Sequence, residues 1–241
     1  MQRYFCDKKE NNKFILNDSD IHHIKNVMRM QEKDLIEIVF NECLYICNSD
    51  GTIISKKDVN RKTKKVILIV PILKEQKMDY ILQKSTELGV SEIIPVRMNR
   101  CNINYGSKED AKVIRWNKIC KEASQQCKRL NTPIVRKIID FKSLKLDDGL
   151  KILCSTKEKS KSIKNVLKTS SICDKLYIVV GPEGGLTDNE EEYLKQKKFI
   201  SVTLGDNILR SETVPLFVLS VINYESMEWR LCYYLKLQTK I

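Results

Sequence analysis

The spacing of apolar residues is strand-like near the amino terminus and changes to alternating strands and helices further along. Residues 35–47 mix alternation with β-branched runs broken at Asn41-Glu42, which predicts a β-hairpin, and Thr52–Ser55 resumes a strand pattern after a turn. The polar stretch 60–65 contains no apolar residue and predicts a boundary. We therefore expect two units in the 241 residues, a small strand-rich one at 1–66 and a larger one at 67–241.

Beyond this boundary the pattern is typical of an α/β fold. Val66–Leu73 is an apolar run suited to a buried parallel strand, and the helix after it ends where Gly89 fits a left-handed cap. Further strands are predicted at 93–96, 151–154, 176–180 and 200–204, and further helices at 108–130, 160–167 and 188–196. Because helices separate the strands, we predict a mainly parallel sheet.

Two of these strands run directly into turns that contain glycine. Gly181–Gly185 follows the strand at 176–180 and precedes a helix. Gly205-Asp206-Asn207 follows the strand at 200–204 and leads through Ile208–Thr213 into another helix. Glycine lets the backbone approach a ligand closely, and open α/β sheets bind ligands at the carboxyl ends of their strands. The two turns are therefore candidate ligand sites.

Each turn also has a purely structural interpretation. Thr187 and Glu190 have the spacing of a helix-capping box, and Arg210 with Glu212 would make a surface ion pair. The sequence contains neither a phosphate-binding loop nor a dinucleotide-binding fingerprint, which removes the main support for nucleotide-triphosphate and ordinary dinucleotide folds. Two glycine turns after two buried strands, with a cation and a carboxylate beside them, favour a ligand site.

The composition narrows the choice of partner. Lys and Arg number 43 and Asp and Glu 31, and the net charge of +12 favours a polyanion such as nucleic acid or an anionic membrane surface. Nine cysteines without Cys-x-x-Cys spacing and only two histidines, His22 and His23, argue against a metal site and indicate reduced thiols. The charged amino terminus and the absence of an apolar run of roughly 20 residues predict a soluble, cytoplasmic protein.

Two motifs in the carboxyl-terminal half resemble those of a known family. Gly-Pro-Glu-Gly-Gly at 181–185 and Leu-Gly-x-x-Ile-Leu-Arg-x-Glu-Thr at 204–213 are similar to the RsmE family of SPOUT-class ribosomal RNA methyltransferases. Upstream, the helix and strand at 77–95, the helix with Arg115-Trp116 and Glu122–Arg129, and the segment from His22 to Arg29 also resemble it. The resemblance covers residues 1 to about 225. The chain departs from the family pattern at Asn41-Glu42, where Asp-Gly is frequent, at Lys128, where glycine is frequent, and at Pro215.

The resemblance implies a small PUA-like β-barrel that docks RNA, followed by a SPOUT-type parallel sheet with a carboxyl-terminal trefoil knot. It also implies a homodimer that uses S-adenosylmethionine to methylate N3 of a uridine in the decoding region of 16S ribosomal RNA, within the small ribosomal subunit. Carried over by position, the cofactor is expected against Gly181, Glu183, Gly184, Gly185, Leu204, Gly205, Ile208, Leu209 and Thr213, with Leu153–Ser155 as a third loop.

Methylation of uracil N3 suggests roles for the remaining charged residues. N3 becomes nucleophilic on losing its proton, and the negative charge spreads onto the flanking carbonyl oxygens. Arg210 is the expected stabiliser of that anion, because a guanidinium matches two oxygens better than an ammonium does. Glu212 is the candidate for accepting the proton or for orienting Arg210. RNA phosphates are expected at a set of arginines: Arg3, Arg29, Arg100, Arg115 and Arg129.

Two other functions remain open on the sequence alone. The same glycine turns would suit a ribose 2′-O-methyltransferase, which differs in its methylated product. A non-catalytic RNA-binding or ribosome-assembly protein would keep the fold without binding S-adenosylmethionine. The tail at 226–241, aromatic and apolar between Trp229 and Leu237, is expected either to cover a dimer interface or to form a closing strand.

Overall fold

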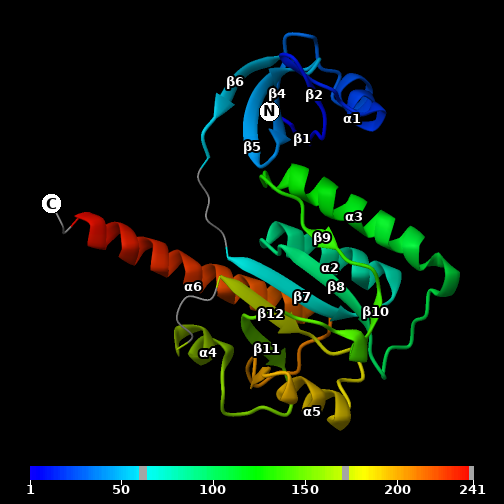
Figure 1. Cartoon of the computed structure of the whole chain (residues 1–241), viewed down its shortest axis with the longest axis vertical. Helices are drawn as coiled ribbons and strands as arrows, with labels where there is room; N and C mark the ends of the chain where they lie inside the picture. Colours follow the sequence, from blue (N-terminus) through cyan, green and yellow to red (C-terminus); the bar gives the residue numbers. More distant parts are fainter. Residues whose placement is uncertain (60–63, 170–173, 239–241) are drawn as a thin grey trace. The chain divides into compact units, whose positions relative to one another are not determined.

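The computed structural model describes residues 1–59, 64–169 and 174–238, with side chains as far as residue 226 (Figure 1). The chain forms two compact units, Met1–Thr63 with Lys121–Thr132, and Lys64–Cys120 with Pro133–Ile241. The polar stretch 60–65 that predicts a boundary lies mostly outside the described residues, which omit 60–63. The first unit also contains 121–132, and nothing in the hydrophobic pattern predicts that second segment.

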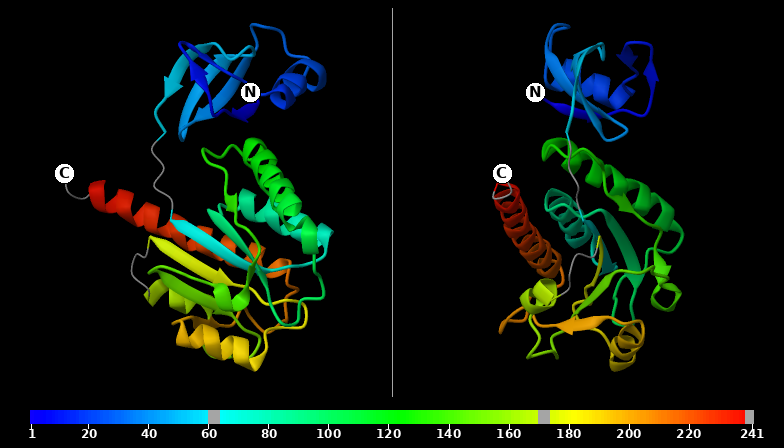
Figure 2. Two further views of the ribbon diagram at one scale, coloured as in Figure 1. Left: turned by 45° about the vertical axis from the view of Figure 1, so that its right-hand side comes forward. Right: turned by 60° about the vertical axis from the view of Figure 1, so that its left-hand side comes forward.

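The first unit is built on a four-stranded sheet in the order β1-β4-β5-β6 (Figure 2). β1 is parallel to β4, and the other two pairs are antiparallel. A separate two-stranded ribbon, β2 with β3, precedes α1 and the short π-helical segment η1. The bounds are β1 (Arg3–Phe5), β2 (Lys9–Glu10), β3 (Lys13–Phe14), α1 (Asp18–His22), η1 (His23–Val27), β4 (Leu35–Phe40), β5 (Cys43–Asn48) and β6 (Ile53–Lys57).

The predicted hairpin is confirmed as β4 and β5, with Phe40 opposite Cys43. The two residues between them, Asn41 and Glu42, have positive φ angles of 47° and 59°. A two-residue loop of this kind matches the right-handed twist of the strands. Glutamate adopts positive φ less readily than glycine, which explains why Asp-Gly is frequent at this place in the resembled family.

The second unit contains a seven-stranded sheet in the order β10-β8-β7-β12-β11-β13, with β9 also paired to β8. Every strand pair of this sheet within the described residues is parallel, so the predicted α/β fold with a parallel sheet is confirmed. The strands are β7 (Lys65–Pro71), β8 (Glu92–Arg97), β9 (Ile134–Val135), β10 (Ile139–Asp140), β11 (Leu150–Cys154), β12 (Lys175–Val179) and β13 (Ile200–Val202). The helices are α2 (Glu75–Glu87), η2 (Gly106–Lys108), α3 (Glu109–Gln126), η3 (Phe141–Ser143), α4 (Ile163–Thr169), α5 (Asp188–Gln196) and α6 (Thr213–Gln238).

Alternate residues of the strands supply two cores, one on each face of this sheet. On β7, Leu68 packs in the cluster that includes residues of α2, α3, α4 and α6, and Ile69 packs in the cluster that includes Leu194 of α5. Because β11 lies between β12 and β13, the segments that follow these two strands leave the sheet on either side of the end of β11. The strand order therefore brings the two glycine turns to the same edge.

The ends of two helices, α2 and α3, are left-handed, and the last helix differs from one prediction. Gly89 follows α2 with a φ of 91°, so the predicted cap is confirmed. Lys128 follows α3 with a φ of 62°, which accounts for the glycine that the resembled family frequently has there. The chain from Thr213 to Gln238 is one helix, and the prediction of a closing strand at Trp229–Leu237 is therefore wrong.

Two chemical features of the described residues bear on function. The cysteines found there lie in buried and half-buried positions: Cys6, Cys43, Cys47, Cys101, Cys120, Cys127 and Cys154. Among the helices of the described chain, none combines the length and the apolar character that crossing a bilayer demands.

Replacing Lys198 by glycine is expected to stabilise the protein by about 0.5–1 kcal/mol. Lys198 is exposed at the end of α5 with a φ of 66°, a conformation that costs a lysine more than a glycine. Urea denaturation followed by circular dichroism measures the change. The control Lys195→Gly, inside α5, is expected to destabilise by about 1 kcal/mol. A denaturation midpoint for Lys198→Gly at or below that of the wild type would contradict the prediction.

Candidate functional site

The two glycine turns line one cavity of about 490 Å³ in the second unit. The first turn contributes Gly181–Gly185, the second contributes Ile208–Ser211, and the end of β11 contributes Cys154–Thr156. An adjoining hollow of about 50 Å³ shares Cys154–Thr156, Ile208 and Leu209 with the cavity. Three segments that follow neighbouring parallel strands thus surround one space, which is where α/β sheets bind ligands.

The first turn is fixed by the start of α5. Thr187 and Glu190 form a capping box in which the Thr187 amide donates to Glu190 Oε2 at 2.8 Å and the Glu190 amide donates to Thr187 Oγ1 at 3.3 Å. Glu190 Oε1 also accepts a hydrogen bond from the Asn99 amide at 2.8 Å. The predicted capping box is therefore confirmed, and the turn lines a cavity as well.

Arg100 holds the same turn from the loop after β8. Its Nη1 atom donates to the carbonyl of Gly184 at 2.7 Å and to that of Leu186 at 3.4 Å. A Cβ atom on Gly184 would lie 3.3 Å from two carbons of the Arg100 side chain, and Gly185 has a φ of 71°. The adjacent glycines thus suit the turn for different reasons, close approach of a side chain at Gly184 and backbone conformation at Gly185.

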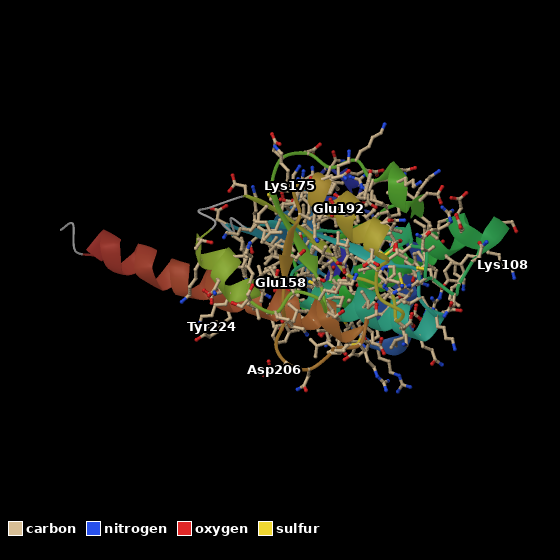
Figure 3. All side chains as sticks on the ribbon, turned by 90° about the horizontal axis from the view of Figure 1, so that it is seen from below. Lys108, Glu158, Lys175, Glu192, Asp206 and Tyr224 are labelled. Atoms are coloured by element: carbon tan, nitrogen blue, oxygen red, sulfur yellow. The ribbon has the colours of Figure 1, made fainter. Side chains whose placement is uncertain are left out.

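The second turn is tied to the first by a hydrogen bond. Ser211, which is 5% exposed, donates from Oγ to the carbonyl of Gly181 at 2.7 Å. Gly205 opens the turn with a φ of 122°, and a Cβ atom there would meet nothing within 4 Å, so conformation alone requires glycine. Asp206 is exposed, and Figure 3 shows it on the outer edge of this turn, away from the strands. The Thr213 amide, at the start of α6, donates to the Arg210 carbonyl at 2.8 Å.

Charged side chains from three segments meet beside the cavity. Lys77 Nζ of α2 lies 3.1 Å from Glu183 Oε1 of the first turn and 3.2 Å from Glu212 Oε2 after the second. The hydrogen bond to Glu183 and the neighbouring Glu212 carboxylate raise the pKa of Lys77, so its ammonium stays charged at neutral pH. Arg210 is exposed and has no hydrogen bond or ion pair within the part of the chain that the structure describes. The predicted surface ion pair between Arg210 and Glu212 is thus replaced by the pair of Glu212 with Lys77.

The third segment presents polar groups that are already paired and one uncharged thiol. Ser155 Oγ donates to Glu191 Oε1 at 3.1 Å, and Lys157 Nζ lies 3.5 Å from Glu191 Oε2. Burial raises the pKa of the Cys154 thiol to about 12. Because the thiolate is the nucleophilic form of cysteine, Cys154 does not supply a nucleophile to this cavity at neutral pH.

The structure gathers most of the expected cofactor residues. Six of them line the large cavity, namely Gly181, Glu183, Gly184, Gly185, Ile208 and Leu209. Leu204 and Gly205 line the adjoining hollow, as does Cys154 of the expected third loop. Arg210 also lines the cavity. Glu212 and Thr213 are not among its lining residues and lie where α6 begins.

The arginines expected to contact RNA lie in very different surroundings. Arg3 is 6% exposed, and its guanidinium donates to Glu37 Oε2 at 3.0 Å and to the carbonyls of Lys128 and Arg129. The expectation for Arg3 is therefore wrong, because its donors are buried and already used within the first unit. Arg29 of the same unit is exposed.

Two further arginines are engaged by side chains near them. Arg115 donates to both carboxylate oxygens of Asp79, at 2.7 and 2.5 Å, and lies 3.1 Å from Glu75. These two carboxylates neutralise its charge, which leaves Arg115 poorly suited to bind phosphate. Arg129 donates to the Asn131 side chain at 2.9 Å.

Sequence reasoning left Lys77 and Ser211 out of the site. Lys77 lies in a segment that resembles the family, but its partners are 106 residues and more away in the sequence, so no local pattern predicts them. Ser211 stands between Arg210 and Glu212 and looks like a spacer until the fold places it beside Gly181. The only sequence signal for either residue was its position inside a motif.

The cavity suits S-adenosylmethionine on three counts. Its volume falls in the range of small-molecule sites, about 300–1,000 Å³. The amides from Asp206 to Leu209 have no acceptor among the described residues, and Ile208, Leu209 and Val214 offer apolar surface, as an adenosine group needs. The carbonyl and carboxylate oxygens of Gly181, Glu183 and Glu191 among the lining residues are hydrogen-bond acceptors, which an amino group needs.

Comparison with known proteins first defines the class. A model of the RNA methyltransferase domain matches residues 60–223, and one of the RNA methyltransferase PUA domain matches residues 16–47. The chain is therefore an RNA methyltransferase with an amino-terminal PUA-type domain. This agrees with a cavity at the carboxyl ends of parallel strands in the second unit.

Individual relatives specify the family. Ribosomal RNA small subunit methyltransferase E of Bacillus subtilis (strain 168) is 33% identical, with 94% of this chain and 97% of that protein covered. The protein of the same name from Mesomycoplasma hyopneumoniae (strain 232) is 31% identical, covering 91% and 98%. A crystal structure of ribosomal RNA small subunit methyltransferase E from Neisseria gonorrhoeae, bound to S-adenosyl methionine, has a TM-score of 0.83 and 26% identity over 93% and 97%. The chain belongs to the ribosomal RNA small subunit methyltransferase E family, which confirms the resemblance in the motifs.

Replacing Gly184 by alanine is expected to weaken binding of S-adenosylmethionine about 10-fold. The new methyl group would meet Arg100, and overpacking of this size costs about 1–3 kcal/mol. The double variant Gly184→Ala with Arg100→Ala is expected to recover part of the affinity, because it removes Arg100 Cδ, one of the two carbons 3.3 Å away, and keeps Cβ. Isothermal titration calorimetry gives the dissociation constants, with Arg100→Ala alone as the control. Equal losses in the single Gly184→Ala and the double variant would show that the contact with Arg100 is not the cause.

Proposed function

We propose that this protein transfers a methyl group from S-adenosylmethionine to N3 of a uridine in the decoding region of 16S ribosomal RNA. Membership of the ribosomal RNA small subunit methyltransferase E family supports the substrate class, and the solved relative bound to S-adenosyl methionine supports the methyl donor. The observation that carries the proposal is the meeting of two glycine turns around one cavity, with the unpaired Arg210 among its lining residues.

The residues of the cavity suggest how the reaction is assisted. S-adenosylmethionine supplies, when bound, an electrophilic methyl group that must lie in line with the acceptor nitrogen. Arg210 is free to donate hydrogen bonds to one of the carbonyl oxygens beside N3, which leaves the nitrogen open to the methyl group, and these bonds strengthen as the uracil becomes an anion. Gly181–Gly185 and Ile208–Leu209 hold the donor by backbone groups and apolar contacts.

The arrangement of Glu212 favours one of its two expected roles. Accepting the proton of N3 would neutralise the Glu212 carboxylate and break its 3.2 Å ion pair with Lys77. We therefore assign Glu212 a positioning role. The proton of N3 is released to water, and Arg210 stabilises the uracil anion that results. Thr213 fixes the Arg210 backbone through its amide hydrogen bond of 2.8 Å.

The finer features implied by the resemblance also belong to this proposal. The link from Ser211 to the Gly181 carbonyl, directly before α6, is compatible with a carboxyl-terminal trefoil knot. Phe217 and Tyr224 of α6 are 38% and 63% exposed, and they support a homodimer interface on that helix. Figure 3 labels Tyr224 on α6. Arg29 and Arg100 are the expected arginines that stay exposed, and they support RNA contacts, which would place the protein in the cytoplasm with the small ribosomal subunit.

The purified protein is expected to methylate small ribosomal subunits that lack this modification. Labelled methyl transfer gives the rate, and digestion of the RNA to nucleosides identifies the product. N3-methyluridine is the expected product. A 2′-O-methylated nucleoside would instead identify a ribose methyltransferase, and failure to bind S-adenosylmethionine in calorimetry would identify a non-catalytic RNA-binding protein.

Arg210→Ala is expected to lower the methylation rate about 100-fold at saturating cofactor, as loss of one anion-stabilising donor does in other enzymes. The affinity for S-adenosylmethionine should change little, because Arg210 is assigned to the uracil. The control is Arg136→Ala, which removes an arginine bound to Glu92 at 2.8 Å outside the cavity. An unchanged rate for Arg210→Ala would refute the assigned role.

A further inference from the structure

Lys77 is the one side chain that joins the two turns electrostatically within the described part of the cavity. Its ammonium lies 3.1 Å from Glu183 and 3.2 Å from Glu212, and its side chain is 30% exposed. These carboxylates come from turns that are adjacent in space and 29 residues apart in sequence, since they stand at positions 183 and 212. One cation therefore neutralises a carboxylate from each turn.

The acidic residues near Lys77 on α2 are paired with other cations, so Lys77 is available to Glu183 and Glu212. Its acidic neighbours on the helix bind cations of α3: Glu75 lies 2.9 Å from Lys112, and Asp79 lies 2.5 Å from Arg115. Met78, next in sequence, is fully buried in the core and holds the helix against the sheet. The backbone of Lys77 is thus anchored, and its side chain reaches the turns from a rigid element.

The consequence concerns Arg210, two residues before Glu212. A guanidinium beside an unpaired carboxylate forms an ion pair wherever geometry allows, and bidentate pairs of this kind are strong. With Lys77 in place, Glu212 is occupied and Arg210 has no partner among the described residues. Without the ammonium, Glu183, which lines the same cavity as Arg210, and Glu212, two residues further along the chain, would both be uncompensated.

We propose that Lys77 is a positioning residue that occupies the carboxylates of Glu183 and Glu212 and thereby keeps Arg210 free for the uracil anion. This inference rests on the proposed function and adds a residue to it. Lys77 does not itself accept the proton, because its ammonium is already protonated at neutral pH. Its effect on the reaction is exerted through Arg210.

The first test is the pH dependence of methylation by the full-length protein. Lys77→Met is expected to lower kcat about 10-fold at neutral pH, as loss of a supporting residue commonly does. It should also move the rising limb of kcat to higher pH, because a captured Arg210 no longer favours the uracil anion. Lys77→Arg should keep the wild-type profile. The matched control is Lys84→Met on the same helix, which removes a lysine bound to Glu87 at 2.8 Å and should leave the profile unchanged.

A double-variant comparison separates this role from a merely structural one. Adding Glu212→Gln to Lys77→Met should restore kcat at least in part, since the carboxylate that captures Arg210 is gone. Adding Arg210→Ala to Lys77→Met should cause no further shift of the pH profile beyond that of Arg210→Ala alone. Additive losses in both combinations, or an unshifted profile for Lys77→Met, would overturn the inference.

Calorimetry with S-adenosylmethionine is the readout that does not depend on catalysis. The dissociation constant of Lys77→Met for S-adenosylmethionine should lie within about 3-fold of that of the wild type. A wild-type protein that binds no S-adenosylmethionine would refute the proposed function itself. If the wild type methylates normally and Lys77→Met has the same kcat and the same pH profile, only the role of Lys77 is refuted.

Discussion

The site depends on the contact between two turns that the strand order brings together. β11 lies between β12 and β13, so the segments after β12 and β13 flank its end, and Ser211 binds the Gly181 carbonyl at 2.7 Å. This bond is costly to break, because the Ser211 hydroxyl is buried and would lose its partner away from water. This hydrogen bond fixes the distance between the turns, and the cavity is the space that remains between them.

Around that contact, the charges are arranged so that most are already satisfied. Glu190 caps α5 and accepts the Asn99 amide, Arg100 holds the carbonyl of Gly184, and Lys77 compensates Glu183 and Glu212. Preorganised groups of this kind need no rearrangement when charge develops in a reaction. Arg210 is the exception in the described part of the cavity, and an unpaired guanidinium at such a place is the group best able to respond to a new negative charge.

The net charge of +12 makes every arginine a candidate RNA contact, but the tertiary structure shows which of them are already paired within the protein. The guanidinium of Arg3 is hydrogen-bonded to Glu37 and two backbone carbonyls, and that of Arg115 is paired with Asp79 and Glu75. Arg29 remains exposed, and Arg100 supports the glycine turn while remaining exposed. The formal net charge thus says little about which arginines can bind RNA. An arginine in an ion pair within the protein is already neutralised and attracts a phosphate less.

Hydrophobic periodicity was enough to predict the parallel α/β sheet, and characteristic residues predicted the hairpin at Asn41-Glu42, the glycine cap after α2 and the two turns that carry the motifs. All of these are local properties of the chain. The partners of Lys77, the link from Ser211 to Gly181, the burial of Arg3 and the assignment of 121–132 to the first unit became visible only in the folded chain. Each of these joins residues that are distant in the chain, and no periodicity records which of many compatible charges or hydroxyls will meet once the strands are ordered.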